Sequence, residues 1–166
     1  SFNSGGLNSC LLKTIDGEPR MMNYESLAEG GFATGTMMGS GGFIVLDEDQ
    51  SVVKHTLSLA HFYMHESCGQ CTPCREGTGW MWRILKNIAN GKGTLADIDL
   101  LWDIQRKIEG NTICPLGDAA AWPVASAIRH FRDEFEWYVK NPELSQTQNY
   151  GLANYADPIP VAMSNN

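Results

Sequence analysis

Residues 66–77 read Glu-Ser-Cys-Gly-Gln-Cys-Thr-Pro-Cys-Arg-Glu-Gly and place Cys68, Cys71 and Cys74 three positions apart. Cys114 follows forty positions later and precedes a proline. Four cysteine thiolates at one locus are the ligand set of a [4Fe-4S] cluster, whereas zinc sites usually take their cysteines from two separate C-x-x-C pairs. The spacing therefore favours an iron–sulfur cluster held by these four cysteines, and a structural zinc site is the alternative.

The chemistry expected of such a site is electron transfer. With four thiolate ligands no iron is left open for a substrate, which argues against Lewis-acid catalysis. Cations close to the negatively charged cluster would raise its reduction potential. Arg75 directly follows the third cysteine, and Arg129 or His130 could reach the site from a later helix. All three are candidates for tuning, although a plain surface ion pair is an equally good interpretation of Arg75.

Helical periodicity dominates the middle of the chain. Hydrophobic residues recur at steps of three and four over about 51–66, 73–89, 95–109 and 122–140. Thr72 is a candidate N-cap for the second helix, with Pro73 at its first position. The pattern predicts a mainly α fold, an antiparallel four-helix bundle over residues 51–140.

The helix lengths provide an independent check on Cys114. A helix over 73–89 carries the chain roughly 25 Å away from Cys74, because each residue adds about 1.5 Å. The helix over 95–109 carries it back, since the Gly91-Lys92-Gly93 turn makes the two helices antiparallel neighbours. We therefore expect Cys114 to return beside Cys74, which would lie in the first turn of its helix, where backbone N–H groups favour a thiolate.

The two ends of the chain differ from this helical part. Residues 1–50 are rich in glycine and end in a short apolar run over 43–46, which predicts a strand at the end of an incomplete β-containing domain. Cys10 lies there, apart from the other cysteines, and we expect it to be a buried small side chain rather than a ligand. Residues 141–166 show no hydrophobic period, so we expect an extended or disordered tail.

Composition excludes several classes of function. The 166-residue chain carries 12 lysine and arginine residues against 19 aspartate and glutamate residues, a net charge of −7. This balance argues against nucleic acid or an anionic lipid surface as the main partner. No stretch is apolar for long enough to span a bilayer. Five cysteines without a recognisable secretion signal indicate a reducing compartment, where clustered cysteines more often bind metal than form disulfides.

Two long motifs in the same order closely resemble one protein family. Residues 66–77, together with Ile-Glu-Gly-Asn-Thr-Ile-Cys-Pro-Leu-Gly-Asp at 108–118, are similar to the 51 kDa-type flavoprotein subunit of NADH:quinone oxidoreductase, respiratory complex I. The resemblance extends from about residue 5 to about residue 136 and includes Ala-Trp-Pro-Val at 121–124. It identifies the chain as a carboxyl-terminal portion of a subunit of this kind.

The resemblance implies a domain order and a flow of electrons. Residues 1–50 would be the last part of a β-grasp domain, and residues 51–140 the helical domain with its [4Fe-4S] cluster on Cys68, Cys71, Cys74 and Cys114. NADH would reduce FMN in a preceding domain whose motifs are absent from these residues. The cluster would then take electrons from FMN one at a time and pass them to the next iron–sulfur cluster.

The resemblance also implies partners and a location. The expected partners are other peripheral-arm subunits of complex I, notably the adjacent [2Fe-2S] subunit and the next iron–sulfur subunit, with quinone as the final acceptor. The expected location is peripheral, on the cytoplasmic side of the bacterial inner membrane or on the matrix side in mitochondria. Flavoprotein (diaphorase) subunits of NAD-linked hydrogenases and formate dehydrogenases carry the same cysteine motif and are the alternative.

We predict that the 166-residue chain, loaded with its cluster, oxidises no NADH by itself, because none of its motifs provides a flavin and nucleotide site for hydride transfer. Dithionite should bleach the visible absorbance of the cluster, and NADH supplied with FMN should leave it unchanged. Bleaching by NADH would contradict the prediction and would direct attention to the glycine-rich stretch over residues 30–42.

Overall fold

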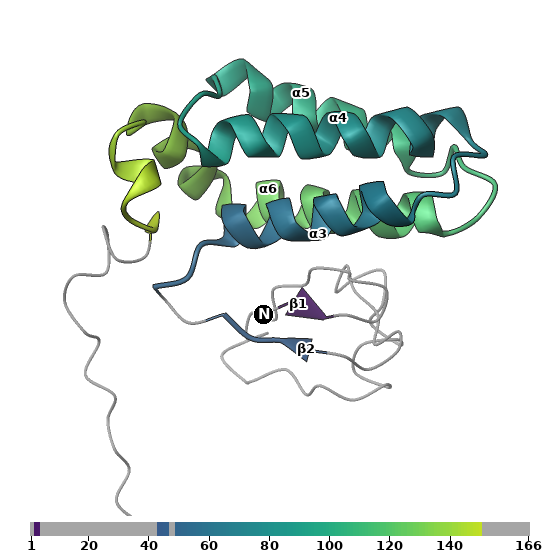
Figure 1. The fold of residues 1–166 in the computed structure, drawn as a ribbon, viewed down its shortest axis with the longest axis horizontal. Helices are drawn as coiled ribbons and strands as arrows, with labels where there is room; N and C mark the ends of the chain where they lie inside the picture. The colour runs from purple at the N-terminus through teal and green to yellow at the C-terminus, as the bar shows by residue number, and fades with distance from the viewer. Residues whose placement is uncertain (1, 4–42, 47–48, 151–166) are drawn as a thin grey trace, which may run out of the picture.

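The chain forms a bundle of helices in its central part. The structure, a computed structural model, describes residues 2–3, 43–46 and 49–150. Within these residues the long helices are α3 (Val52–Glu66), α4 (Thr72–Ala89), α5 (Leu95–Ile108) and α6 (Leu116–Lys140). Each runs antiparallel to the next, and α6 closes the ring against α3 (Figure 1). The mainly α fold and the antiparallel four-helix bundle predicted from the sequence are confirmed.

The helix starts follow from capping. Ser51 accepts a hydrogen bond from the N–H of Lys54, and Thr94 and Asp97 form a reciprocal capping box at the start of α5. At α4 the prediction of Thr72 as N-cap is wrong by one residue. Cys71 is the N-cap, because its extended backbone precedes the helix and its carbonyl accepts the first intrahelical bond from the N–H of Arg75 at 2.8 Å.

The start of α6 also differs from the prediction. The helix begins at Leu116, not near Trp122-Pro123, and Pro123 lies inside it. The three alanines at 119–121 are strong helix formers and carry the helix up to the proline, which fits there although it supplies no N–H for the backbone ladder. Phe131 has non-helical backbone angles, so α6 is two helical stretches joined at that residue.

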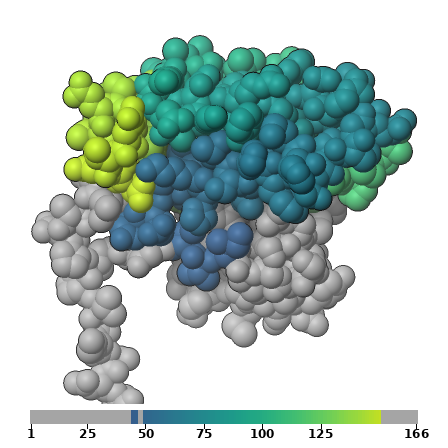
Figure 2. Space-filling model, viewed as in Figure 1, coloured from purple at the N-terminus to yellow at the C-terminus, as the bar shows by residue number. Residues whose placement is uncertain are grey.

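The core of the bundle is filled by large apolar side chains from all four helices. In the space-filling view α3 and α4 form one continuous face over it (Figure 2). Gly77 of α4 leaves room for the side chain of Ile108 of α5, because a Cβ there would come within 2.7 Å of Ile108 Cδ1. The largest fully buried apolar side chains are Val53, Met81, Leu85, Ile88, Ile98, Leu101, Ile108, Val124, Phe135 and Tyr138.

A buried carboxylate ties α6 to the start of α3. Glu134 is only 2% exposed, and it accepts hydrogen bonds from the hydroxyl of Ser51 at 2.7 Å and from the N–H groups of Val52 at 3.3 Å and Val53 at 3.1 Å. The Tyr138 hydroxyl donates to the Ser51 oxygen at 2.9 Å. Burial raises the pKa of Glu134, and its hydrogen bonds oppose that shift. The carboxylate thereby satisfies backbone donors that a helix start leaves without partners.

The ends of the chain are described only in part. Strands β1 (Phe2–Asn3) and β2 (Phe43–Ile44) pair antiparallel, and Ile44 and Leu46 pack against the core. Residues 4–42, which hold Cys10 and most of the predicted partial β-grasp segment, lie outside the described residues. Of the predicted tail over 141–166, the structure describes residues 141–150, which include a 3-10 helix, η1 (Leu144–Gln146). Among the helices described here, none combines the length and apolar character needed to cross a membrane.

We predict that Glu134→Ala lowers the free energy of unfolding by about 3 kcal/mol, because it leaves buried donors at the start of α3 without an acceptor. Chemical denaturation followed by circular dichroism measures the change. Glu136→Ala is the matched control: this carboxylate forms only surface ion pairs with Arg132 and Lys140, so its loss should matter far less. Equal destabilisation by the two substitutions would contradict the role of Glu134.

Candidate metal centre

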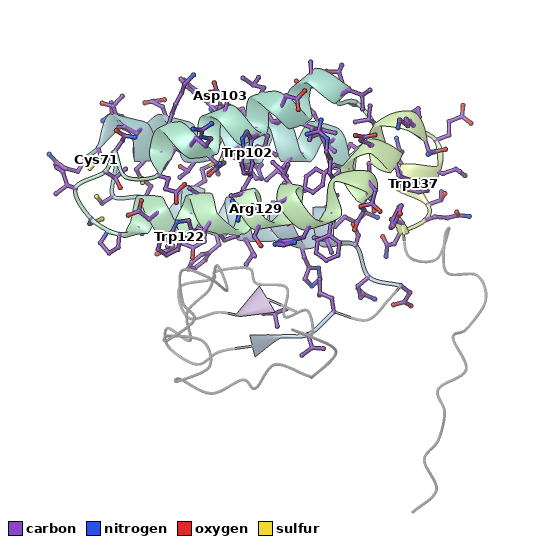
Figure 3. The ribbon with its side chains drawn as sticks, turned by 180° about the vertical axis from the view of Figure 1, so that it is seen from behind. Cys71, Trp102, Asp103, Trp122, Arg129 and Trp137 are labelled. Carbon is purple, nitrogen blue, oxygen red and sulfur yellow. The ribbon has the colours of Figure 1, made fainter. Side chains whose placement is uncertain are left out.

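The topology brings all four predicted ligands to one end of the bundle. In an up-down-up-down bundle the first and third connections lie at the same end. Cys68 and Cys71 lie in the α3–α4 connection, Cys74 lies in the first turn of α4, and Cys114 lies in the α5–α6 connection. Figure 3 shows Cys71 at the opposite end of the molecule from Trp137. The return of Cys114 to the start of α4, expected from the helix lengths, is confirmed.

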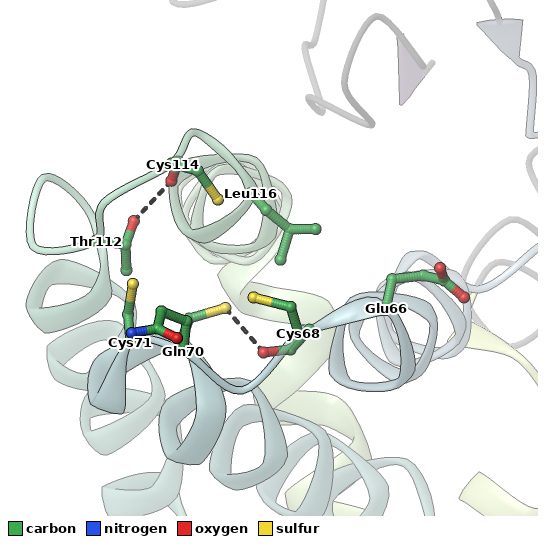
Figure 4. A pocket seen from close by; sticks show the side chains of 9 residues that line it. Glu66, Cys68, Gln70, Cys71, Thr112, Cys114 and Leu116 are labelled. Carbon is green, nitrogen blue, oxygen red and sulfur yellow. Dashed lines mark hydrogen bonds between the residues drawn. The ribbon is translucent and has the colours of Figure 1, made fainter.

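The four cysteines line a single cavity of about 140 Å³. This is roughly ten times the space that one water molecule needs. All four are free thiols, and side chains from the two connections face one another across the cavity (Figure 4). The residues that line it are Glu66, Ser67, Cys68, Gln70, Cys71, Cys74, Thr112, Cys114 and Leu116.

The donor set and the spacing favour a polynuclear group over a single ion. Thiolate sulfurs are soft ligands that select iron–sulfur clusters, zinc or copper(I). A zinc ion draws four ligands to about 2.0–2.3 Å from one centre. Within the part of the chain that the structure describes, no three histidine, cysteine, aspartate or glutamate side chains lie close enough together for that. Four soft sulfur donors around a cavity of about 140 Å³ are compatible with a group of the size of a cluster.

Hydrogen bonds reach two of the four sulfurs. The hydroxyl oxygen of Ser67 lies 3.2 Å from Cys74 Sγ, and the backbone N–H of Ile113 donates to Cys71 Sγ at 3.3 Å. Among the described residues, no hydrogen bond reaches the sulfur of Cys68 or Cys114. These last two cysteines are exposed, whereas Cys74 is 7% exposed. The cavity is therefore asymmetric, with the buried cysteine and both hydrogen-bonded sulfurs at the start of α4.

Arg75 fastens the cysteine-bearing connection to α4. Its guanidinium donates to the carbonyl of Gly69 at 2.8 Å and to the hydroxyl of Thr72 at 3.4 Å, and it pairs with Glu76 at 3.0 Å. The surface ion pair that the sequence offered as one interpretation of Arg75 is thus present, and the same side chain also holds the α3–α4 connection against α4. The side chain is exposed and does not line the cavity.

The other two candidate cations, Arg129 and His130, do not line the cavity either. The guanidinium of Arg129 lies 5.7 Å from the ring centre of Trp102, in the middle of the bundle (Figure 3). This cation–π contact points the side chain at α5 rather than at the cysteines. Arg129 therefore does not contact the cavity. Its aromatic partner Trp102 lies on another helix, so the spacing of residues in the sequence gives no sign of this cation–π contact.

The α5–α6 connection is shaped by polar contacts around Cys114. Thr112 donates its hydroxyl to the carbonyl of Cys114 at 3.0 Å, and Asp118 accepts from the N–H of Gly110 at 2.7 Å. Gly117 lies against Thr112, so closely that an added Cβ would overlap the threonine side chain. Sequence reasoning missed Ser67, Thr112 and Gly117, because their roles depend on which groups the two connections bring together.

A family model described as the NADH-ubiquinone oxidoreductase-F iron-sulfur binding region matches residues 54–138. The chain belongs to this family. The matched region contains α4, α5 and all four cysteines of the cavity. The family description agrees with a [4Fe-4S] cofactor and with the resemblance drawn from the two cysteine motifs.

Two curated relatives from Rickettsia match most of the length of this chain. The NADH-quinone oxidoreductase F subunit of Rickettsia typhi is 51% identical over 120 residues, which are 72% of this chain and 28% of the relative. The same subunit of Rickettsia bellii is 48% identical over 132 residues, which are 80% of this chain and 31% of the relative. The chain thus spans about three tenths of the length of these relatives.

A solved structure shares part of the fold. A crystal structure of an NAD+-reducing [NiFe]-hydrogenase in the H2-reduced state superposes with a TM-score of 0.55 at 35% identity. The match covers 57% of this chain and 16% of the hydrogenase chain.

We predict that Gly117→Ala lowers both thermal stability and iron content, because the new methyl group displaces Thr112 and with it the loop of Cys114. The expected loss is about 2 kcal/mol, typical of overpacking in a close contact. Gly79→Ala is the matched control, since a Cβ there would meet only ordinary contacts of 3.7 Å and longer. Within helix α4 the control should be neutral or stabilising by up to about 1 kcal/mol. Full iron content in Gly117→Ala would contradict the prediction.

Proposed function

We propose that Cys68, Cys71, Cys74 and Cys114 hold a [4Fe-4S] cluster and that the chain carries single electrons within an NADH-quinone oxidoreductase. The observation that carries the proposal is the cavity, which is lined by four cysteines from the α3–α4 connection, the first turn of α4 and the α5–α6 connection. Membership of the iron–sulfur binding family supports the identity of the group. A bound cluster of this kind supplies one-electron chemistry and leaves no iron open to a substrate.

The chain's own groups suit a negatively charged cofactor. Cys74 lies in the first turn of α4, where free N–H groups and the positive end of the helix dipole stabilise thiolates. Ser67 and the N–H of Ile113 supply hydrogen bonds to sulfur. Leu116 adds an apolar side to the cavity, and burial of Cys74 keeps water from that sulfur. These groups hold the ligands in place and lower the cost of added negative charge.

The complete electron path extends beyond this chain. We propose the domain order of the family: the end of a β-grasp domain over residues 1–50, the cluster domain over 51–140 and a tail over 141–166. NADH would reduce FMN in a part of the protein that these residues do not include. Electrons would pass from FMN to the four-cysteine site and on to an iron–sulfur cluster in a neighbouring subunit, towards quinone.

The partners follow from this path. We infer that the chain works in a multi-subunit complex beside a [2Fe-2S] subunit and a further iron–sulfur subunit. Its place would be peripheral, on the cytoplasmic side of a bacterial inner membrane or on the matrix side in mitochondria. Reduction of NAD+ in a hydrogenase is the second candidate, supported by the structural match at 35% identity. The identity of 51% to the NADH-quinone oxidoreductase relative from Rickettsia typhi favours quinone as the acceptor.

We predict that Cys114→Ala abolishes cluster binding and loosens the cysteine end of the bundle, because metal–ligand free energy is also folding free energy. The wild type should bind about four iron atoms per chain and give an EPR signal after one-electron reduction. Cys10→Ala is the control and should keep its full iron content. Zinc in place of iron in the purified wild type, or unchanged iron and melting temperature in Cys114→Ala, would contradict the proposal.

A further inference from the structure

Ser67 joins three parts of the site through one side chain and one backbone group. It is the C-cap of α3, and its backbone N–H donates to the carbonyl of Tyr63 at 3.1 Å. Its hydroxyl oxygen lies 3.2 Å from Cys74 Sγ and accepts a hydrogen bond from the N–H of Gly69 at 3.4 Å. The end of α3, the connection and the first turn of α4 therefore meet at this hydroxyl.

The direction of the hydrogen bond to sulfur follows from the chemistry of the ligand. A thiolate that binds iron carries no proton, so only the hydroxyl can donate. The N–H of Gly69 occupies a lone pair of the same oxygen, which leaves the hydroxyl proton for the sulfur. Cys74 is the buried cysteine of the four and its hydrogen bond to Ser67 is partly buried, and a hydrogen bond shielded from water is electrostatically stronger than one in water.

We propose that Ser67 is a positioning residue that raises the reduction potential of the cluster by donating a hydrogen bond from its hydroxyl to Cys74 Sγ. The inference rests on the proposed function, because it requires the four cysteines to hold the cluster. Reduction by one electron takes the core with its four thiolates from a formal charge of −2 to −3, and the proton stays on the serine oxygen. The hydrogen bond strengthens as the sulfur gains negative charge, so it stabilises the reduced state more than the oxidised state.

The hydrogen bond from Ser67 can be tested separately from the other hydrogen bond to a cysteine sulfur. The second hydrogen bond to sulfur comes from the backbone N–H of Ile113 and persists in every side-chain variant. Substitution of Ser67 therefore removes one donor of the two found among the described residues. Ser67→Thr keeps the hydroxyl, and Ser67→Val replaces the threonine hydroxyl with a methyl group at nearly the same volume.

The test is an EPR-monitored redox titration of the full chain with its cluster, as wild type, Ser67→Thr and Ser67→Val. The valine variant should lower the equilibrium constant for reduction about threefold to tenfold relative to threonine, since a hydrogen bond to a charged group is worth more than one to a neutral group. Tenfold corresponds to a midpoint about 59 mV more negative for a one-electron couple. Ser58→Val is the matched control, because Ser58 lies exposed on α3 and, among the described residues, its hydroxyl bonds only the carbonyl of Lys54.

The outcomes distinguish this inference from the proposed function. A wild type without a [4Fe-4S] cluster would overturn both, whereas equal midpoints of Ser67→Thr and Ser67→Val would overturn only the inference. If Ser67→Val does not assemble a cluster, the proposal is tested on the reduced wild type. The proton hyperfine couplings of its cluster are then compared between H2O and D2O to find those that exchange. Two exchangeable proton couplings, from the hydroxyl of Ser67 and the N–H of Ile113, would support the proposal, and a single one would overturn it.

Discussion

The close pairing of α4 with α5 at Gly77 and Ile108 is the contact on which the site depends. The side chain of Ile108 occupies the space beside Gly77, where an added Cβ would lie 2.7 Å from Ile108 Cδ1. α4 has 18 residues and α5 has 14, which correspond to about 27 Å outward and about 21 Å back. The residues between Ile108 and Cys114 make up the difference. This pairing, together with the packing of α6 on the other helices, sets the position of Cys114 relative to Cys74.

The two ends of the bundle satisfy their helix starts in different ways. At one end Glu134 accepts hydrogen bonds from the N–H groups at the start of α3, so that helix receives its negative charge from within the chain. At the other end Cys71 is the N-cap of α4 and makes no side-chain cap bond. The free N–H groups and the positive end of the dipole there are left for thiolates and a negatively charged cofactor. The start of α4 is thus available to stabilise negative charge at the site.

Local patterns predict most of this arrangement, and long-range contacts account for the errors. The cysteine spacing, the helical periods and the capping signal at Thr94 involve neighbours in sequence, and they suffice for the bundle and for the meeting of the cysteines. The predicted start of α6 is wrong because Pro123 has the pattern of a first helical residue, although alanines before it continue the helix. The prediction that Arg129 reaches the site fails because its guanidinium lies over the ring of Trp102 in α5, and a contact between two helices leaves no pattern in the local sequence. Ser67 carries no sequence signal of its own.

The polar contacts that the structure describes at the cysteine end lie mostly within one connection or the other, and the hydrogen bond from the N–H of Ile113 to Cys71 Sγ joins the two. The α5–α6 connection depends on single hydrogen bonds, such as those from Thr112 to the carbonyl of Cys114 and from Ile113 to the sulfur of Cys71. A single exposed hydrogen bond contributes only about 1 kcal/mol, whereas metal–thiolate bonds contribute many times that amount to folding. With the ligand set proposed above, the cofactor would be the main cross-link between the two connections. The same metal–thiolate bonds would fix the cluster relative to the helices that surround it, so that one proposed set of bonds would serve both the stability of this end and the transfer of electrons.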